Sequence, residues 1–198
     1  MFADASAALC GWREVLRRLG GVGRDPARYG GAAYGNLSVR VPPLGEPGRG
    51  RRRFLVTGTQ TGGRAAFALA DCSVVEGYDL MLNQVRSFGG TPPSSESMTH
   101  GAIYDAAPSS RAVFHVHSPE LWTKARALGL PVTRAEVPYG TPEMAREVER
   151  LFREGALHVH GIFAMAGHED GVIAFGDGAD QAGATLLRHW ARALAIGR

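Results

Sequence analysis

The sequence predicts an α/β fold in which helices cover a mostly antiparallel sheet. Short apolar runs bounded by glycine and proline predict strands, and longer segments with apolar residues at helical spacing predict helices. Strands and helices are interspersed, and no repeat, linker or low-complexity tract divides the 198 residues. The 44% hydrophobic and 21% charged residues are typical of a globular protein that can build its own core. We therefore expect a single domain over residues 1–198.

The N-terminal part predicts a helix followed by a hairpin. Apolar residues recur at helical spacing from Leu9, and Gly20 ends this helix. The alternating segment 37–41 predicts a half-buried strand, and 54–56 predicts a second one. The segment 42–50 between them is rich in proline and glycine, so the two strands are expected to form a hairpin with a long tip.

The remaining elements are predicted by helix caps and apolar runs. Serine and threonine cap helices, and proline fits the first helical turn, so Ser94 or Ser95, Pro119 and Thr141 each begin a predicted helix. The predicted helices are 97–107, 119–128, a helix from Pro142 and 179–194. The predicted strands are 72–76, a strand around Met81, 112–117, 162–165 and 171–176. The arginines at 51–53 are expected in a solvated loop.

Composition and charge argue against several classes of function. The net charge of +3 is small, and no basic stripe interleaved with aromatic residues appears, so nucleic-acid binding is not expected. Charged residues interrupt the apolar start of the chain, and no stretch approaches the roughly 20 apolar residues that a membrane span needs. Cys10 and Cys72 fit reduced thiols. We expect a cytoplasmic protein without a membrane partner.

A histidine pair at the end of a predicted buried strand is the strongest functional signal. His115 and His117 are spaced i, i+2, and such residues on a strand point to the same face. Two imidazoles on one face can hold a divalent metal, although core histidines with this spacing are an alternative. A second pair, His158 and His160, follows Gly155 in a predicted loop or edge strand. There, exposed histidines are the simpler interpretation.

His168 is the best candidate for a third metal ligand. It lies in a glycine-flanked turn between two predicted strands, from which its side chain can reach a neighbouring strand. Three neutral imidazoles leave an open position for substrate or water, as in catalytic zinc sites. Glu96, in the first turn of its helix, is a capping residue, a general acid/base, or a metal ligand that is released when substrate arrives. His100 lies one turn later and is expected to pack or hydrogen-bond behind the site.

Three separated fragments offer groups that can bind an anion. They are Asn36, Thr57–Gly58 and Ser94–Ser95, each with small donors or free backbone N–H groups beside a glycine or a helix start. Such groups bind phosphate or another anion without a lysine. Each fragment alone also fits an ordinary turn.

Together these pieces resemble the class II aldolase/adducin family, which includes fuculose-phosphate aldolase and ribulose-phosphate epimerase. The matching fragments are Gly35–Arg40, Thr57–Gly58, Pro93–Glu96 with His100, Ala112–His117 and the segment from Gly167 to Gly176. They extend over nearly the whole chain, and the combined pattern is specific although no single fragment is.

The resemblance implies a fold and a set of site residues. The fold would be three-layer α/β/α with a central mostly antiparallel sheet, commonly assembled as a homotetramer with active sites near subunit borders. His115, His117 and His168 would be zinc ligands, and Glu96 would be the catalytic acid/base. The pocket for a substrate phosphate would be lined by Asn36, Thr57, Gly58, Ser94 and Ser95.

The resemblance also implies a class of reaction. We expect a zinc-dependent lyase that acts on a small phosphorylated sugar or hydroxy-carbonyl compound through a metal-stabilised enediolate, with aldol cleavage foremost. Epimerisation, dehydration and decarboxylation pass through a similar intermediate, and Mn²⁺, Co²⁺ or Fe²⁺ could occupy the same ligands. The alternatives from other classes are a metallohydrolase and a non-catalytic, adducin-like interaction domain.

The chain departs from the family in one segment. Sugar-phosphate aldolases that it resembles carry a longer stretch after the His-x-His strand, and this stretch holds a tyrosine used as proton donor at the neighbouring subunit's site. Here little lies between Pro131 and Val137, and Tyr139 belongs to the later turn. No counterpart of that tyrosine is predicted, so metal binding is better supported than aldol cleavage itself.

Overall fold

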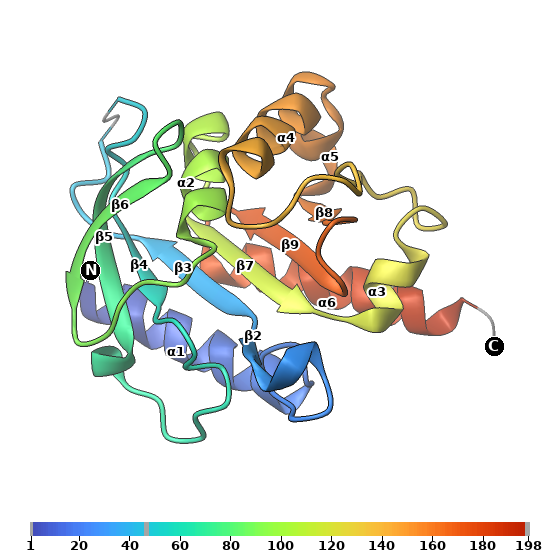
Figure 1. Ribbon diagram of the computed structural model, residues 1–198, viewed down its shortest axis with the longest axis horizontal. Helices are drawn as coiled ribbons and strands as arrows, with labels where there is room; N and C mark the ends of the chain where they lie inside the picture. Colours follow the sequence, from blue (N-terminus) through green and yellow to red (C-terminus); the bar gives the residue numbers. More distant parts are fainter. Residues whose placement is uncertain (1, 46–47, 197–198) are drawn as a thin grey trace.

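A seven-stranded sheet forms the centre of the computed structural model, which describes residues 2–45 and 48–196 (Figure 1). The strand order is β6–β5–β4–β3–β7–β9–β8, and every neighbouring pair is antiparallel. The strands are β3 (Asn36–Arg40), β4 (Phe54–Thr57), β5 (Cys72–Asp79), β6 (Gln84–Gly89), β7 (Ala112–His117), β8 (Ile162–Ala164) and β9 (Gly171–Gly176). A separate pair, β1 (Gly23–Arg24) and β2 (Ala33–Tyr34), precedes the sheet.

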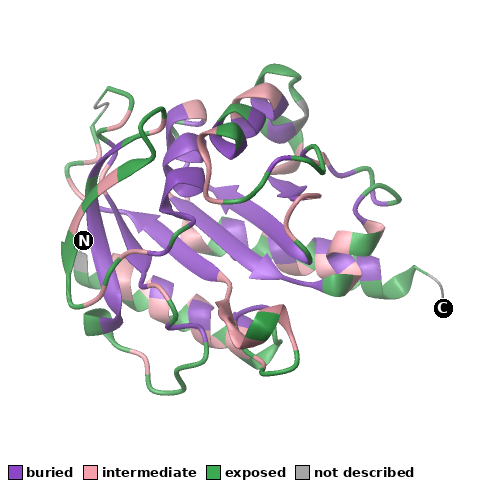
Figure 2. Ribbon diagram, viewed as in Figure 1, coloured by how far each residue is buried: buried purple, intermediate pink, exposed green. Residues whose placement is uncertain are grey.

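Helices cover both faces of the sheet and give three layers (Figures 1 and 2). One face packs against α1 (Phe2–Arg18), α3 (Pro119–Lys124) and α6 (Ala179–Ala195), and the other against α2 (Ser97–Ala106), α4 (Pro142–Arg153) and α5 (Ala156–His160). Two short 3-10 helices, η1 (Tyr29–Gly31) and η2 (Leu69–Asp71), lie in the connections. The predicted three-layer α/β/α fold is confirmed.

The alternation of side chains along β7 explains the two apolar cores and the direction of the histidines. Phe114 and Val116 pack in the core with α1, α3 and α6, whereas Val113 packs in the core with α2 and α4. Successive strand residues face opposite sides of a sheet, so His115 and His117 share the face of Val113. All six residues of β7 are buried because both faces are covered.

The register of β7 with its neighbours brings distant parts of the chain together. Asn36 of β3 pairs with His115, and Gly171 of β9 pairs with His117. The start of β3, the end of β7 and the β8–β9 turn therefore meet at one end of the sheet. This end is where the candidate site lies.

The predicted strand around Met81 is wrong. β5 continues to Asp79, and Met81 lies in the turn that leads into β6. The Asp79 carboxylate accepts the N–H groups of Met81 and Leu82 at 2.9 and 3.0 Å, which favours a turn over a strand. The strand β6 was not predicted because its side chains are mostly exposed and form no apolar run.

The prediction of solvated arginines at 51–53 fails for Arg52. Its side chain is buried, and its guanidinium pairs with Asp105 of α2 at 3.1 Å. The carboxylate offsets the cost of burying the charge. Glu46 and Pro47, at the tip of the predicted 42–50 loop, lie outside the described residues.

Two further predictions differ in detail from the structure. The helix that starts at Pro119 ends at Lys124, and turns continue to Gly129, which has a positive φ of 70°. His158 and His160 lie in the short helix α5 rather than in a loop or edge strand. Both cysteines are free, and none of the helices in the described residues is long and apolar enough to cross a membrane.

Candidate functional site

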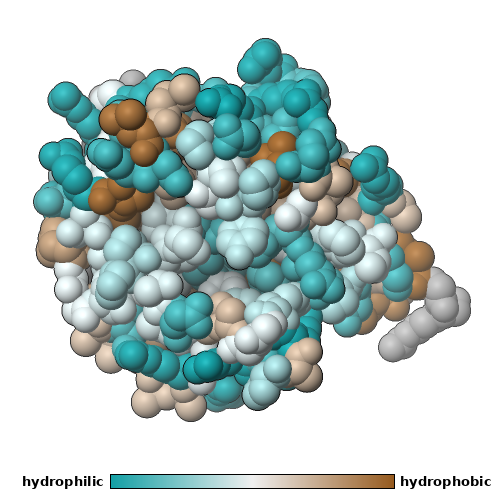
Figure 3. All heavy atoms as spheres, in the orientation of Figure 1, coloured by the Kyte–Doolittle hydropathy of each residue, from teal (hydrophilic) through white to brown (hydrophobic). Residues whose placement is uncertain are grey.

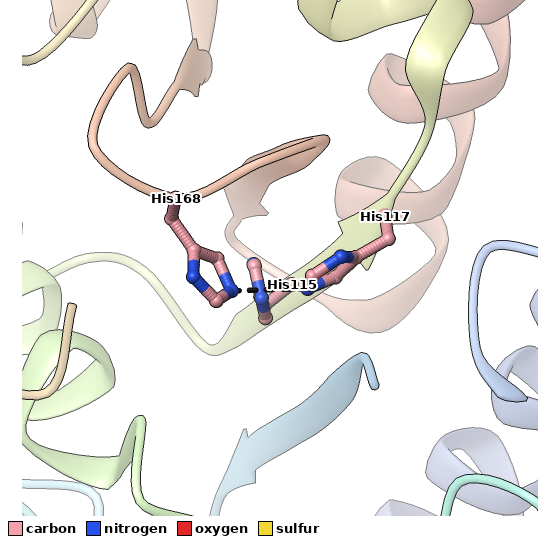
Figure 4. Close-up of side chains that lie close together, drawn as sticks. All are labelled: His115, His117 and His168. Atoms are coloured by element: carbon pink, nitrogen blue, oxygen red, sulfur yellow. Dashed lines mark hydrogen bonds between the residues drawn. The ribbon is translucent and has the colours of Figure 1, made fainter. Parts of the chain in front are cut away.

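Three histidines from two parts of the chain lie together at the end of the sheet (Figure 4). β7 carries His115 and His117 on one face, and the β8–β9 turn brings His168 toward them. The centroids of the three rings are 4.7, 5.0 and 5.1 Å apart. The turn is tight, because the N–H of Gly171 donates to the carbonyl of His168 at 2.9 Å. A Cβ at Gly171 would lie 2.5 Å from the His168 ring, so only glycine allows this approach.

The ring nitrogens are arranged in a way that fits a divalent cation. Nε2 of His117 and Nε2 of His168 are 3.0 Å apart, and one ligand atom from each of the three residues lies within 4.8 Å of the others. A zinc ion about 2.1 Å from each nitrogen needs ligands less than about 4.2 Å apart, so small ring rotations suffice. Among the described residues, nothing hydrogen-bonds Nδ1 of His115 or of His117.

Burial keeps the three imidazoles neutral. It lowers the pKa of His117 to about 3 and the pKa of His168 to about 4. Burial, together with the positive charge that neighbouring histidines would carry, also lowers the pKa of His115 well below 6.5. A neutral imidazole presents the lone pair that a metal requires. The cluster can therefore offer three ligands at neutral pH.

Glu96 stands at the N-cap of α2 with its carboxylate buried and 3.9 Å from Nε2 of His168. It makes no capping hydrogen bond, so the alternative role of a capping side chain is not realised. Neither carboxylate oxygen accepts a hydrogen bond of normal geometry from a described residue, and the nearby Thr99 side chain only opposes part of the effect of burial on the pKa. Burial raises the pKa of Glu96 to about 7. A carboxyl group with this pKa can accept and release a proton near neutrality.

His100 lies behind this cluster, as its position on α2 predicted. It is completely buried, and its Nδ1 is 2.7 Å from the hydroxyl of Ser38. The same hydroxyl is 2.8 Å from the hydroxyl of Tyr104. His100 does not line the cavity next to the histidine cluster. It therefore supports α2 from the inside rather than facing a substrate.

A cavity of 340 Å³ opens beside Glu96 and the three histidines. Figure 3 shows the molecule from the side on which its surface is hollowed near the centre. Four residues predicted to bind phosphate line this cavity, namely Asn36, Gly58, Ser94 and Ser95. Thr57 does not line it, because its hydroxyl faces the sheet and accepts the N–H of Leu37 at 3.2 Å.

Three tyrosines line the cavity that were not predicted as site residues. Tyr29 and Tyr34 pack against His117, with ring centroids 4.5 and 5.3 Å away, and Tyr139 packs against His168 at 4.0 Å. The sequence holds no signal that places Tyr29 or Tyr34 near the strand of His117. Tyr139 was recognised in its turn, but only the fold shows that this turn borders His168.

Residues 32, 33, 35, 59–62, 167 and 169 complete the lining, and no lysine or arginine is among the described lining residues. Of the loop at residues 57–62, only Thr57 and Gly58 were predicted to bind an anion. An anion in the cavity would therefore be bound by neutral donors and by any cation at the histidines.

Arg28, Tyr29 and Asp170 connect the segment over the cavity to the β8–β9 turn. The Tyr29 hydroxyl donates to the Asp170 carboxylate at 2.5 Å, and the Arg28 guanidinium donates to the same oxygen at 3.0 Å. Burial and the Asp170 carboxylate raise the pKa of Tyr29, so its hydroxyl stays protonated. This cluster holds the ring of Tyr29 against His117.

The fragments that form this site fall inside a family match. The sequence profile of the Class II Aldolase and Adducin N-terminal domain matches residues 25–189. The chain belongs to this family. Class II aldolases generally depend on divalent metal ions, and the three histidines are residues that could bind one here. Some members of the family are non-catalytic.

Solved structures of class II aldolase family proteins share the fold. L-fuculose-1-phosphate aldolase from Thermus thermophilus superposes with a TM-score of 0.69 at 21% identity, over 98% of this chain and 93% of that one. YgbL from Klebsiella pneumoniae has aldolase, epimerase and decarboxylase as candidate activities. It superposes with a TM-score of 0.69 at 21% identity, over 98% of this chain and 88% of that one. At these identities the similarity shows the fold alone. No curated protein sequence matches significantly.

Proposed function

We propose that this class II aldolase family member is a zinc-dependent lyase. Its substrate would be a small phosphorylated sugar or another hydroxy-carbonyl compound, cleaved by an aldol reaction through an enediolate. One observation carries the proposal: a buried carboxylate that accepts no hydrogen bond from the described residues lies 3.9 Å from one of three clustered histidines and borders the same cavity. Buried polar groups are normally hydrogen-bonded, and exceptions with shifted pKa values gather at functional sites.

His115, His117 and His168 would hold the metal. Zinc is the expected ion, and Mn²⁺, Co²⁺ or Fe²⁺ can use similar ligands. When bound, the cation would supply stabilisation for negative charge that develops on the carbonyl and hydroxyl oxygens of the substrate. Three protein ligands would leave the metal able to bind a further ligand, and the three histidines line the cavity through which a substrate would enter.

Glu96 would transfer the proton. In the cleavage direction, a base takes the proton from the hydroxyl beside the breaking carbon–carbon bond, the aldehyde leaves, and an acid protonates the remaining carbon. A carboxyl group with a pKa of about 7 can perform either transfer. Its position at the cavity wall, next to His168, supports this role.

Asn36, Gly58, Ser94 and Ser95 would receive the phosphate end of the substrate. They come from β3, from the end of β4 and from the turn before α2, and all four border the cavity. Neutral donors near a helix start bind phosphate because free N–H groups and the helix dipole favour negative charge. Thr57 is left out of this group, since its hydroxyl is used inside the sheet.

A product screen tests the reaction. The zinc-loaded protein is incubated with phosphorylated and free ketoses and oxo-acids, and release of aldehyde and of carbon dioxide is followed. Aldehyde from a phosphorylated ketose is the expected result. Carbon dioxide release, epimer formation or loss of water would instead identify a decarboxylase, epimerase or dehydratase, activities that overlap with the candidates for YgbL.

Binding of an enediolate mimic separates a lyase from a non-catalytic domain. A phosphorylated hydroxamate is expected to bind the zinc-loaded protein tightly and the metal-stripped protein weakly. Equal binding to both forms, together with no turnover in the screen, would contradict the proposed function and favour an adducin-like interaction domain.

A further inference from the structure

A buried arginine lies behind the loop that forms one wall of the cavity. Arg13 of α1 is only 1% exposed. Its Nη2 donates to the carbonyl oxygens of Thr61, Gly62 and Arg64 at 2.9, 2.8 and 2.6 Å. The Cζ atom of Arg13 lies 4.3 Å from the centroid of the Phe67 ring. Within the described part of the chain, no carboxylate forms an ion pair with this guanidinium. The carboxylates of Glu14 and Asp71 act on its charge only through space, and the carbonyl groups are its direct partners.

The same loop faces the cavity with its other side. Residues 58–62 line the cavity, and Thr61 and Gly62 are buried. No described group accepts the backbone N–H of Thr61 or of Gly62. In a trans peptide the C=O and N–H groups point in opposite directions. Because the Thr61 carbonyl is held by Arg13, the N–H of Gly62 points away from Arg13.

The loop has little freedom to adopt another orientation. A Cβ at Gly62 would lie 2.6 Å from the carbonyl oxygen of Gly23 and 2.7 Å from that of Tyr34, so β1 and β2 confine it. Gln60 has a positive φ of 58°, a conformation that directs successive N–H groups to one side and occurs in anion-binding loops. Arg13 holds the loop from behind, and the β1–β2 pair confines it at the side.

We propose that Arg13 is a positioning residue that fixes residues 58–62 so that the N–H groups of Thr61 and Gly62 bind the phosphate of the substrate. A buried cation without an ion-pair partner and a buried N–H without an acceptor are both unfavourable. An anion in the cavity would accept the N–H groups and would add negative charge on the far side of the loop from Arg13. This inference rests on the proposed function in one respect, because it extends the phosphate pocket formed by Asn36, Gly58, Ser94 and Ser95.

Inorganic phosphate and metal-stripped protein provide the first test. Isothermal titration calorimetry compares the wild type with Arg13→Met and with the matched control Arg17→Met. Arg17 lies one turn later on α1 and pairs with Glu14 at 2.9 Å, so its replacement removes the same charge without touching the loop. Phosphate is expected to bind Arg13→Met at least ten-fold more weakly and Arg17→Met within two-fold of the wild type. Equal affinities for Arg13→Met and the wild type, or equal losses in both variants, would overturn the proposal.

A comparison of two ligands separates positioning from general support of the fold. In zinc-loaded Arg13→Met, a phosphorylated hydroxamate is expected to lose at least ten-fold in affinity, while the same hydroxamate without phosphate keeps its affinity. Equal losses for both ligands would show that Arg13 only stabilises the fold. Arg13→Lys keeps the charge but reaches fewer carbonyls, so it should restore part of the phosphate affinity.

Nuclear magnetic resonance of the wild type decides the case if Arg13→Met does not fold. Titration of the metal-stripped protein with phosphate is expected to shift the amide signals of Thr61 and Gly62, and unshifted signals would refute the inference. Neither phosphate measurement needs metal or turnover. Failure of the proposed lyase activity would therefore leave this result intact, and failure here would leave the lyase proposal intact.

Discussion

Glu96, His115 and His117 are buried polar residues with atoms that receive no hydrogen bond from the described residues. Arg52 and Asp105 satisfy each other by pairing at 3.1 Å. Arg40 and Thr99 also keep buried atoms that make no hydrogen bond of normal geometry with a described residue, but unlike Glu96, His115 and His117 they do not line the cavity. Desolvation of an unpartnered group is unfavourable in the free protein. At the residue scale, these atoms are therefore available for a cation, a proton or a substrate.

Replacement of Glu96 by glutamine tests its role in proton transfer. The amide side chain keeps nearly the same shape as the carboxylate but cannot accept and release a proton. We expect Glu96→Gln to retain its metal and to lose about 10²–10⁴-fold in kcat, the range typical of general acid–base groups. Steady-state assays with the substrate found in the screen measure kcat, and elemental analysis measures the metal content per chain. Unchanged kcat would refute the role of Glu96.

His117→Ala is expected to lose its zinc. The variant removes the ligand whose Nε2 lies 3.0 Å from that of His168. His158→Ala is the matched control, since His158 belongs to the second His-x-His pair but is exposed on α5. Elemental analysis after dialysis measures zinc per chain. Full zinc content in His117→Ala, or a loss in His158→Ala as well, would contradict the assignment of the ligands.

At the scale of elements, the short segment between α3 and α4 places Tyr139 at the cavity. Thr133 fixes its start, because its N–H donates to Ala164 of β8 and its hydroxyl accepts the N–H of Ala166, both at 3.0 Å. Its end is fixed by Thr141, which caps α4 through the N–H of Met144. The segment is thereby tied to the strand that leads into the His168 turn.

Glu147 of α4 is expected to stabilise the same region in a pH-dependent way. Its carboxylate accepts the N–H of Arg134 at 2.9 Å and two bonds from Arg150 at 2.8 and 3.0 Å. Arg150 chiefly lowers the pKa of Glu147. In the unfolded chain the Glu147 carboxyl has a pKa of about 4.3 and therefore binds a proton at a higher pH than in the folded protein. The stabilisation is present above that pH and is lost as pH falls through the folded pKa.

Urea unfolding of Glu147→Gln tests this expectation. At pH 7 the variant should lose about 1.5–3 kcal/mol of unfolding free energy, the range for hydrogen bonds to a charged group. At pH 3 the difference from the wild type should shrink. Glu143→Gln is the control on the same helix, where a half-exposed carboxylate pairs with Arg146 and little effect is expected. A pH-independent loss in Glu147→Gln would contradict the charge argument.

At the scale of the whole molecule, the β5–β6 hairpin carries several exposed apolar side chains close together in the sequence. Met81, Leu82 and Phe88 are 67%, 64% and 52% exposed, and β6 is an edge strand of the sheet. Exposed apolar side chains on an edge strand favour association with another chain. Members of this family usually form oligomers, and we expect a homotetramer whose contacts include this hairpin.

Sedimentation of Phe88→Glu tests the role of the hairpin. The introduced charge is expected to shift the protein from tetramer toward smaller species, because a carboxylate in an apolar contact is costly to bury. Val159→Glu, at an exposed position of α5, is the control and should leave the assembly unchanged. An identical assembly state for the wild type and Phe88→Glu would show that the hairpin is not at an interface.

Local patterns predicted most of the fold, and they failed where side chains carry no local signal. β7 and β9 were predicted from their apolar runs, and such runs occur because both faces of these strands are buried. β6 was missed because an exposed edge strand needs no apolar run, and Arg52 was misjudged because its partner Asp105 is distant in sequence. The single-domain organisation over residues 1–198 stays a prediction.

The sequence by itself determined which side chains could form the site. The i, i+2 spacing on a strand puts His115 and His117 on one face, and a glycine-flanked turn exposes His168. Only the tertiary structure decided which groups meet: it brings Glu96 to 3.9 Å from His168, places Tyr29 and Arg13 around the cavity, and turns Thr57 into the sheet. The physical reason is that periodicity fixes the direction of a side chain within its own element, whereas distances between elements follow from strand register and from packing between segments far apart in sequence.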